Sequence, residues 1–165
     1  FWHKNPAINC DFHFYGGRYD LSIVEDFKAR LGKMTAPVFY HGEVFGKDKE
    51  NALRSNHIYM LTSRYEGMPL TVLEALAYGN PCVLTLYTNM SDLINKENVG
   101  WVTETNSQSV SECLEKAYND YIKDREGYVK RSVESVIPYK WDEIAKSTSA
   151  AYYSVLRNHG KVKCY

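Results

Sequence analysis

The sequence of 165 residues has no long apolar run and no excess of charge of either sign. A transmembrane helix needs about 20 mostly apolar residues in a row, so no membrane span is expected. Lys and Arg together number 20, as do Asp and Glu, and no block of like charge interrupts the chain. Nucleic-acid recognition needs a basic patch or stripe, so the composition predicts no nucleic-acid partner.

Metal-binding and disulfide signals are also scarce. The chain has no C-x-x-C pair, no D-x-D motif and no histidine cluster, and its four cysteines are scattered: Cys10, Cys82, Cys113 and Cys164. We therefore expect no zinc site and no other metal. Cys10 and Cys82 fall on expected buried strands, where a free thiol behaves as a small apolar group. With no recognisable signal peptide, this pattern predicts a reduced, cytoplasmic setting.

Short apolar stretches alternate with helical patterns along the chain. Leu21, Val24, Phe27 and Leu31 show the three- and four-residue spacing of a helix. We expect strands at 11–15, 37–41, 57–62, 82–86 and 100–103, and helices at 21–31, 47–55, 69–78, 90–95, 109–120, 123–135 and 141–157. This alternation predicts an α/β fold, a Rossmann-like parallel sheet with helices on both faces, as a single domain over residues 1–165.

Glycines and polar residues follow several of the expected strands. Gly16 and Gly17 end the first, Gly42 ends the second, and the loop 63–67 follows the third. Ligands of open parallel sheets bind at the carboxyl ends of the strands. We therefore expect these loops to line one rim.

Residues 63–81 are the most informative stretch. Glu66 lies in a loop and Glu74 on the following helix, eight positions later. Pro69 suits the first turn of that helix and Gly79 suits its C-cap. The helix N-terminus opens at Gly67, where free N–H groups favour phosphate or sugar oxygens. An amphipathic helix with solvated carboxylates is the structural alternative.

This stretch resembles the donor-sugar site of glycosyltransferase family 4, a group of retaining enzymes with the GT-B fold. The family pattern is S-x-x-E-G-x-x-x-x-x-L-E-A-x-A-x-G-x-P, and it matches Ser63, Glu66, Gly67, Leu73, Glu74, Ala75, Ala77, Gly79 and Pro81. Residues 12–16, 40–44, 98–102 and 139–145 are similar to further elements of the same family in order and spacing. The resemblance identifies the chain as the C-terminal, nucleotide-sugar-binding half of a GT-B enzyme.

The resemblance also implies roles for individual residues. Glu66 would contact the donor sugar as the catalytic residue, and Glu74 would bind the ribose hydroxyls, since a carboxylate accepts from two neighbouring hydroxyls. The remaining substrate-binding residues implied are Gly67, Met68, Pro69, Leu70, Thr71, Gly16 and Val44. The enzyme would transfer a hexosyl group from a nucleoside-diphosphate sugar to a saccharide or lipid-linked acceptor in polysaccharide biosynthesis, with no metal or other cofactor.

Two parts of the family's machinery have no match in this sequence. The N-terminal acceptor domain and the start of the donor domain, with an Arg/Lys pair that neutralises the diphosphate, are expected to precede residue 1. Lys4 is too close to the first strand to be the Lys of this pair. Arg18 is a less favoured candidate to replace the Arg that neutralises the diphosphate. We expect the 165-residue chain alone to be inactive. The whole enzyme is expected to be cytoplasmic, and peripheral association with the inner face of a membrane is compatible with this expectation.

Other readings stay open at this point. The chain could be a non-catalytic interaction module, or part of a nucleotide-sugar epimerase of the same fold. His41 is expected to be a structural strand-end residue and Trp101 a packing residue, while Arg64 could meet a phosphate or pair with Glu66. The final helix should leave part of its apolar face exposed or covered by a neighbouring chain, since the family's last helix crosses back to the N-terminal domain: Trp141, Ile144, Tyr152, Val155 and Leu156.

Overall fold

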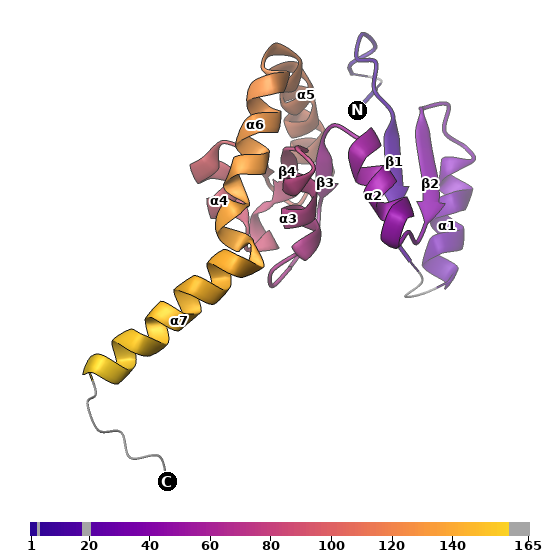
Figure 1. Cartoon of the computed structure of the whole chain (residues 1–165). Helices are drawn as coiled ribbons and strands as arrows, with labels where there is room; N and C mark the ends of the chain where they lie inside the picture. Colours follow the sequence, from indigo (N-terminus) through magenta and orange to yellow (C-terminus); the bar gives the residue numbers. More distant parts are fainter. Residues whose placement is uncertain (3, 18–20, 159–165) are drawn as a thin grey trace.

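A computed structural model describes residues 1–2, 4–17 and 21–158 (Figure 1). Helices and strands alternate through most of this part of the chain, and the long C-terminal helix projects away from the rest. The elements are β1 (Phe12–Tyr15), α1 (Leu21–Leu31), β2 (Val38–Gly42), α2 (Gly46–Ser55), β3 (Tyr59–Leu61), α3 (Leu70–Ala77), β4 (Cys82–Thr85), the 3₁₀ turn η1 (Leu86–Thr88), α4 (Ser91–Glu97), β5 (Gly100–Thr103), α5 (Ser107–Lys123), α6 (Arg125–Ser135), the 3₁₀ turn η2 (Ile137–Tyr139) and α7 (Trp141–Asn158).

The strands are parallel but form two sheets rather than one. β1 pairs with β2, while β3, β4 and β5 pair in that order. The α/β class and the parallel pairing are confirmed, and the five strands are divided between a two-stranded and a three-stranded sheet. β1 and β3 do not hydrogen-bond to each other, and a groove lies between them.

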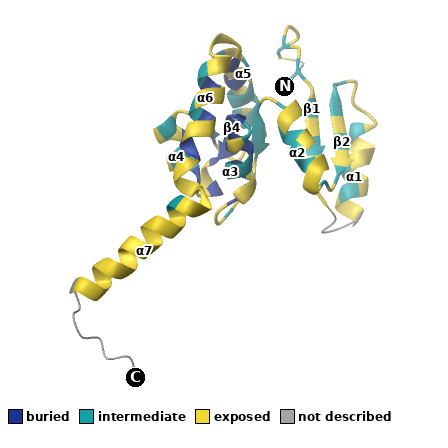
Figure 2. Cartoon of the chain, in the orientation of Figure 1, coloured by how far each residue is buried: buried dark blue, intermediate teal, exposed yellow. Residues whose placement is uncertain are grey.

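The larger sheet carries the core of the molecule (Figure 2). On one face Leu84 packs with Leu76 of α3 and Ile94 of α4. On the other, Val83 packs with Ala117 of α5 and Tyr128 of α6. Adjacent residues of β4 thus enter opposite clusters, because successive strand side chains point to opposite faces. Helices on both faces are therefore confirmed for this sheet.

The smaller sheet has a thinner cover. Phe27 of α1 contacts Phe14 and Tyr40, with ring centroids 5.2 and 5.7 Å apart. Side chains of the opposite face form an exposed row of stacked rings in the order Phe39, His13, His41 and Tyr15, and the two histidine nitrogens Nδ1 and Nε2 lie 2.9 Å apart. This contact fits the structural interpretation of His41.

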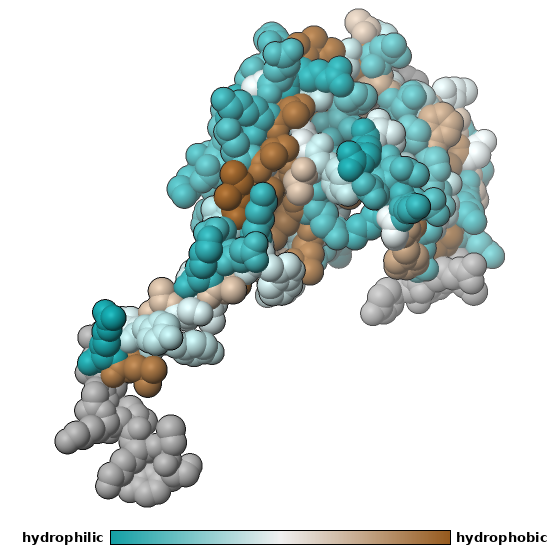
Figure 3. Space-filling model, in the orientation of Figure 1, coloured by the Kyte–Doolittle hydropathy of each residue, from teal (hydrophilic) through white to brown (hydrophobic). Residues whose placement is uncertain are grey.

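Helix α7 leaves most of its surface uncovered, as Figures 1 and 3 show. Trp141 is 84% exposed and Leu156 is 66% exposed, and the main packing of the helix is against η2. The expectation of an exposed apolar face on the final helix is thus confirmed. Among the helices in the described part of the chain, none has the length and apolar character needed to cross a membrane.

Candidate functional site

The groove between the two sheets is the main concave feature of the molecule. It has a volume of about 1250 Å³ and is lined by β1, β3, α2 and α5. Gly16, Val44, Thr71 and Glu74 all line it, so it brings together four of the substrate-binding residues expected from the sequence. Of the strand-end loops expected to share one rim, Gly16, Gly17 and Ser63 line the groove, whereas Gly42 does not.

The loop after β3 is tied to the connection after β4. The backbone N–H of Glu66 donates to the carbonyl of Tyr87 at 3.0 Å, and Asn89 Nδ2 donates to the carbonyl of Gly67 at 2.6 Å. Asn89 adopts a left-handed conformation with φ of 50°, which asparagine tolerates better than most residues. These two bonds hold the loop at the entrance of α3.

Glu66 lies beside the groove rather than on its wall. Its Oε1 accepts a hydrogen bond of 2.7 Å from the hydroxyl of Ser63, which does line the groove. Gly67, Met68, Pro69 and Leu70 are likewise outside the lining, and Met68 and Leu70 are 53% and 65% exposed. The expected site residues therefore fall into two groups. The groove set lines the groove and consists of Gly16, Val44, Thr71 and Glu74, and the loop set lies beside it and consists of residues 66–70.

The ends of α3 differ slightly from the sequence expectation. Pro69 is the N-cap rather than a residue of the first turn, and no side chain caps the N–H groups that follow it. At the other end Tyr78 is the C-cap and Gly79 follows with φ of 83°, a conformation that favours glycine. Because no side chain caps the first turn of α3, its free N–H groups can donate to an anionic or hydroxyl oxygen.

Glu74 has the most informative surroundings in the groove. Its Oε1 accepts a hydrogen bond of 2.7 Å from Lys49 Nζ of α2. Its Oε2 is buried and has no hydrogen-bond partner among the described residues. A buried carboxylate oxygen without a partner is costly, so this atom is ready to accept from a ligand hydroxyl.

Tyr59 of β3 also lines the groove. Burial raises the pKa of the Tyr59 phenol, and a hydrogen bond with Thr71 opposes that shift. The phenol therefore stays neutral beside the carboxylates of Glu74 and Glu66, which also disfavour its ionisation.

The opposite wall is shaped by the loops after β1 and β2. The N–H of Gly16 donates to the carbonyl of Gly42 at 2.9 Å, and the hydroxyl of Tyr40 donates to the carbonyl of Gly16 at 3.0 Å. A Cβ at Gly17 would lie 1.5 Å from Glu43 Oε1, so glycine allows this close approach. Arg18, the candidate phosphate ligand, lies outside the described residues.

Three contributors to the site were not expected from the sequence: Lys49, Tyr59 and Asn89. Each acts through a partner more than ten residues away, so no local pattern marks it. Arg64 makes no ion pair with Glu66 within the described part of the chain, which removes one of its two expected roles. No group of three or more His, Cys, Asp or Glu side chains in residues 1–2, 4–17 and 21–158 is arranged to hold a metal ion.

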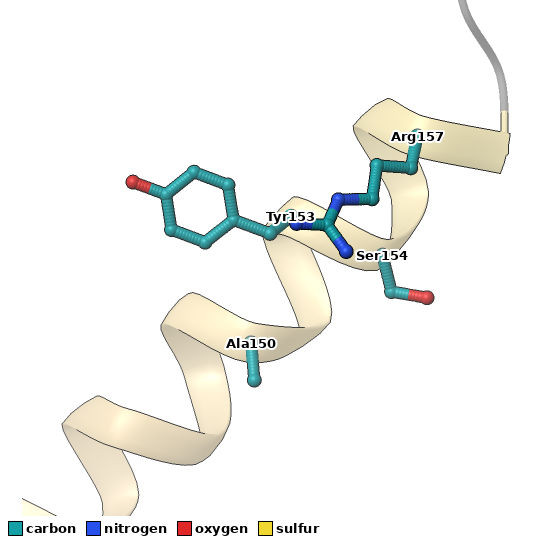
Figure 4. A pocket seen from close by; sticks show the side chains of 4 residues that line it. All are labelled: Ala150, Tyr153, Ser154 and Arg157. Atoms are coloured by element: carbon teal, nitrogen blue, oxygen red, sulfur yellow. The ribbon is translucent and has the colours of Figure 1, made fainter.

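A second hollow lies on α7, far from these residues. Figure 4 shows the side chains that line it on successive turns of one helix: Ala150, Tyr153, Ser154 and Arg157. No other element contributes to it, so nothing encloses a ligand there. The groove is therefore the better candidate site.

The amino-acid sequence matches a known protein family over most of its length. The profile described as "Glycosyl transferases group 1" matches residues 2–120. The chain belongs to this glycosyltransferase family. A similar curated protein is an uncharacterized glycosyltransferase from Methanocaldococcus jannaschii, 29% identical over 140 residues, which cover 84% of this chain and 35% of that protein. An Escherichia coli UDP-Gal:alpha-D-GlcNAc-diphosphoundecaprenol alpha-1,3-galactosyltransferase is 36% identical over 59 residues, which are 36% of this chain and 15% of that enzyme.

Solved glycosyltransferases of the GT-B type share the fold. Sucrose-phosphate synthase from Thermosynechococcus elongatus superposes with a TM-score of 0.69 at 17% identity, over 88% of this chain and 38% of that one. The catalytic domain of starch synthase IV from Arabidopsis thaliana, bound to ADP and acarbose, gives 0.70 at 17% identity, over 94% of this chain and 34% of that one. The glycosyltransferase chain thus spans roughly a third of the length of such relatives.

Proposed function

We propose that this chain is the nucleotide-sugar-binding part of a retaining glycosyltransferase of family 4. The observation that carries the proposal is the Glu74 carboxylate, fixed through Oε1 by Lys49 while its buried Oε2 is left without a partner in the described residues. A ribose presents two neighbouring hydroxyl donors, which match an acceptor held in this way. Lys49 sets the direction of the free oxygen, so Glu74 needs little rearrangement on binding.

The diphosphate is assigned to the first turn of α3. The N-terminus of a helix carries about half a positive charge, and its first N–H groups have no partner in the helix. Gly67, Met68, Pro69, Leu70 and Thr71 place backbone around that turn. Stabilisation of the diphosphate as it leaves is the electrostatic contribution that sugar transfer requires.

Glu66 is assigned to the sugar itself. It lies on the tethered loop beside the α3 entrance, and its Oε1 is oriented by Ser63. A carboxylate near the anomeric centre gains interaction energy as positive charge develops on the sugar ring. Glu66 therefore serves the transition state, whereas Glu74 serves binding.

The nature of the relatives supports a hexosyl donor and a saccharide or lipid-linked acceptor. One named relative is a galactosyltransferase whose name specifies UDP-Gal and a diphosphoundecaprenol-linked sugar, and one structural neighbour was solved with ADP. We propose a nucleoside-diphosphate sugar as donor with no metal, and an acceptor domain elsewhere in the whole enzyme. Where the acceptor is lipid-linked, that enzyme works at the inner face of the membrane.

Calorimetry and kinetics on the whole enzyme test the two assignments. Glu74→Ala removes a charge-assisted hydrogen bond of roughly 1.5–3 kcal/mol, so affinity for the nucleoside diphosphate should fall about tenfold to a hundredfold. Glu66→Ala should leave that affinity nearly unchanged and lower kcat more than it raises KM. Glu115→Ala, an exposed carboxylate on α5, is the matched control and should change neither.

The opposite pattern would reverse the assignment of the two carboxylates. A folded enzyme that binds no nucleoside diphosphate at all would support an interaction module instead. Sugar transfer by the 165-residue chain alone, above its own Glu66→Ala variant, would contradict the proposal that an acceptor domain is required.

A further inference from the structure

Lys49 carries more hydrogen-bond donors than the folded chain uses. Its ammonium nitrogen Nζ has three N–H groups. In the part of the chain that the structure describes, its hydrogen bond is with Oε1 of Glu74, at 2.7 Å. The Lys49 side chain is 38% exposed and lines the groove. Within the described residues, two donors on Nζ therefore remain available to a ligand in the groove.

Glu74 offers an acceptor next to these donors. Its Oε1 is occupied by Lys49, whereas its Oε2 is buried and has no hydrogen-bond partner among residues 1–2, 4–17 and 21–158. The Glu74 side chain as a whole is 39% exposed. The last torsion of a glutamate is broad, so a small turn of the carboxyl group brings Oε2 to the groove. The pair therefore presents one unsatisfied acceptor beside free donors.

Stability alone does not account for a lysine at position 49. The residue lies at the end of the first turn of α2, where the helix dipole disfavours a positive charge. Both members of the ion pair are more than a third exposed, and pairs of this kind contribute little to stability. Lys49 therefore occupies a position where the helix gains little from it, beside the carboxylate assigned to ribose.

A ribose diol is complementary to this pair. Each hydroxyl can both donate and accept a hydrogen bond, so two hydroxyls on adjacent carbons can divide these roles. One hydroxyl donates to Oε2 of Glu74, and its neighbour accepts from Nζ of Lys49. The two side chains cannot exchange roles, because a carboxylate does not donate and an ammonium group does not accept.

We propose that Lys49 is a second ribose ligand, and that Lys49 and Glu74 together select a ribonucleoside diphosphate over its 2′-deoxy and 3′-deoxy counterparts. This assignment rests on the proposed function, because it takes the groove as the nucleotide site. Loss of either hydroxyl leaves one charged group of the pair without its partner. A site built to bond a hydroxyl rejects a ligand that lacks it, so the donor class narrows to sugars carried on ribonucleotides.

Lys49 also balances charge at this place in the groove. A nucleoside diphosphate is an anion, and the carboxylate of Glu74 alone would repel it. With Nζ of Lys49 at 2.7 Å, the pair has no net charge. Loss of Lys49 should therefore lower the affinity for every nucleoside diphosphate. Only the affinity ratio between a ligand and its deoxy form reports a contact with the hydroxyl.

Calorimetry on the whole enzyme tests this ratio. Uridine, cytidine, adenosine and guanosine diphosphates are compared first, and the tightest is then measured beside its 2′-deoxy and 3′-deoxy forms. In the wild type, each deoxy form should bind about tenfold or more weakly than the parent. In Lys49→Met, which keeps an unbranched apolar stem, the parent should lose about tenfold or more in affinity. One of the two deoxy forms should then bind within about threefold of the parent.

Two further variants complete the experiment. Glu74→Ala should abolish the rejection of the other deoxy form, because its hydroxyl is the one that donates to Oε2. Lys47→Met, at an exposed position two residues earlier on α2, is the matched control and should change neither affinities nor ratios. The melting temperature of Lys49→Met should stay within about 4 °C of the wild type, since the half-exposed pair adds little stability.

Four results would overturn the assignment. A much larger fall in melting temperature would make the pair a structural link between α2 and α3. Unchanged rejection of both deoxy forms by a folded Lys49→Met enzyme would mean that Glu74 alone binds both hydroxyls. Equal binding of the parent and both deoxy forms by the wild type would place the ribose elsewhere. A folded wild type that binds none of the four diphosphates would refute the proposed function itself, an outcome that differs from the other three.

Discussion

The part-buried hydrogen bond between Trp101 and Asp120 gives a quantitative test of how the core is held. Trp101 is 6% exposed, its ring packs on Tyr128 with centroids 4.8 Å apart, and its Nε1–H donates to Asp120 Oδ2 at 3.0 Å. This confirms Trp101 as a packing residue. Asp120 also pairs with Lys116 one helical turn earlier.

Asp120→Ala should destabilise the chain by about 1–2 kcal/mol at pH 7. Leaving a buried donor unsatisfied costs about 1–3 kcal/mol, and an exposed i,i+4 ion pair adds about 0.3–0.5 kcal/mol. A negative charge in the last turn of α5 is itself unfavourable by about 0.3–1 kcal/mol, which offsets part of the loss. For a chain of this length the melting temperature should fall by about 2–8 °C.

The pH dependence follows from the ionisation of the same carboxyl. Hydrogen bonds from Lys116 and then from Trp101 lower the pKa of Asp120. A lowered pKa in the folded state means that the ionised carboxylate adds stability above the unfolded value, about 3.9, and that this is lost as pH falls through the lower folded value. Asp120→Asn keeps an acceptor for Trp101, so its deficit against the wild type should shrink below about pH 4.

Urea unfolding followed by circular dichroism measures these differences, with the exposed neighbour Asn119→Ala as the control. The control should stay within about 0.5 kcal/mol of the wild type. The reasoning is refuted if Asp120→Ala costs no more than Asn119→Ala at pH 7. It is also refuted if the deficit of Asp120→Asn stays constant down to pH 2.

Three further outcomes are expected. Leu76→Ala, at a fully buried position of α3, should cost about 2–5 kcal/mol in urea unfolding, whereas Leu70→Ala, 65% exposed on the same helix, should cost less than about 0.5 kcal/mol. Burial raises the pKa of the Cys82 thiol, so a thiol reagent at pH 8 should modify it only at the rate of unfolding; rapid labelling in the folded chain would contradict its placement. Leu156→Ser on α7 should reduce binding of an apolar dye without lowering the melting temperature, because that side chain is 66% exposed; an unstable variant would show that the helix packs on the core.

Local sequence patterns were sufficient for the order of the elements. The apolar spacing from Leu21 to Leu31, ended by Gly32, gave the same bounds as α1, and residues 100–103 form β5 as expected. Helix starts were less accurate. α5 begins at Ser107, two residues before the expected start at 109, because the Asn106 side chain caps the helix by accepting from the N–H of Ser109. Such signals depend on residues within one turn, which the sequence displays directly.

Pairing between distant residues was not predictable in the same way. Nothing near Lys49 shows that it meets Glu74, since the two are 25 positions apart and the contact depends on how α2 crosses the groove. The split of the sheet was missed for a related reason. A strand's own residues show that it is buried, but not whether a neighbour exists on each side. The role of Glu66 stays a prediction, because it rests on a resemblance and the residue lies beside the groove.

Helix α7 has a consequence for how the molecule melts. Its 18 residues gain little from tertiary packing, because their main contacts are with η2, so they depend on bonds within the helix such as Lys146 to Glu143 at 2.7 Å. Most helical stability in proteins comes from tertiary packing, and helicity without it falls as temperature rises. The helix should therefore fray from its C-terminal end in a gradual, non-cooperative phase, at temperatures where the core around β4 is still intact. Far-ultraviolet dichroism will then report two events, and only the later one measures the fold.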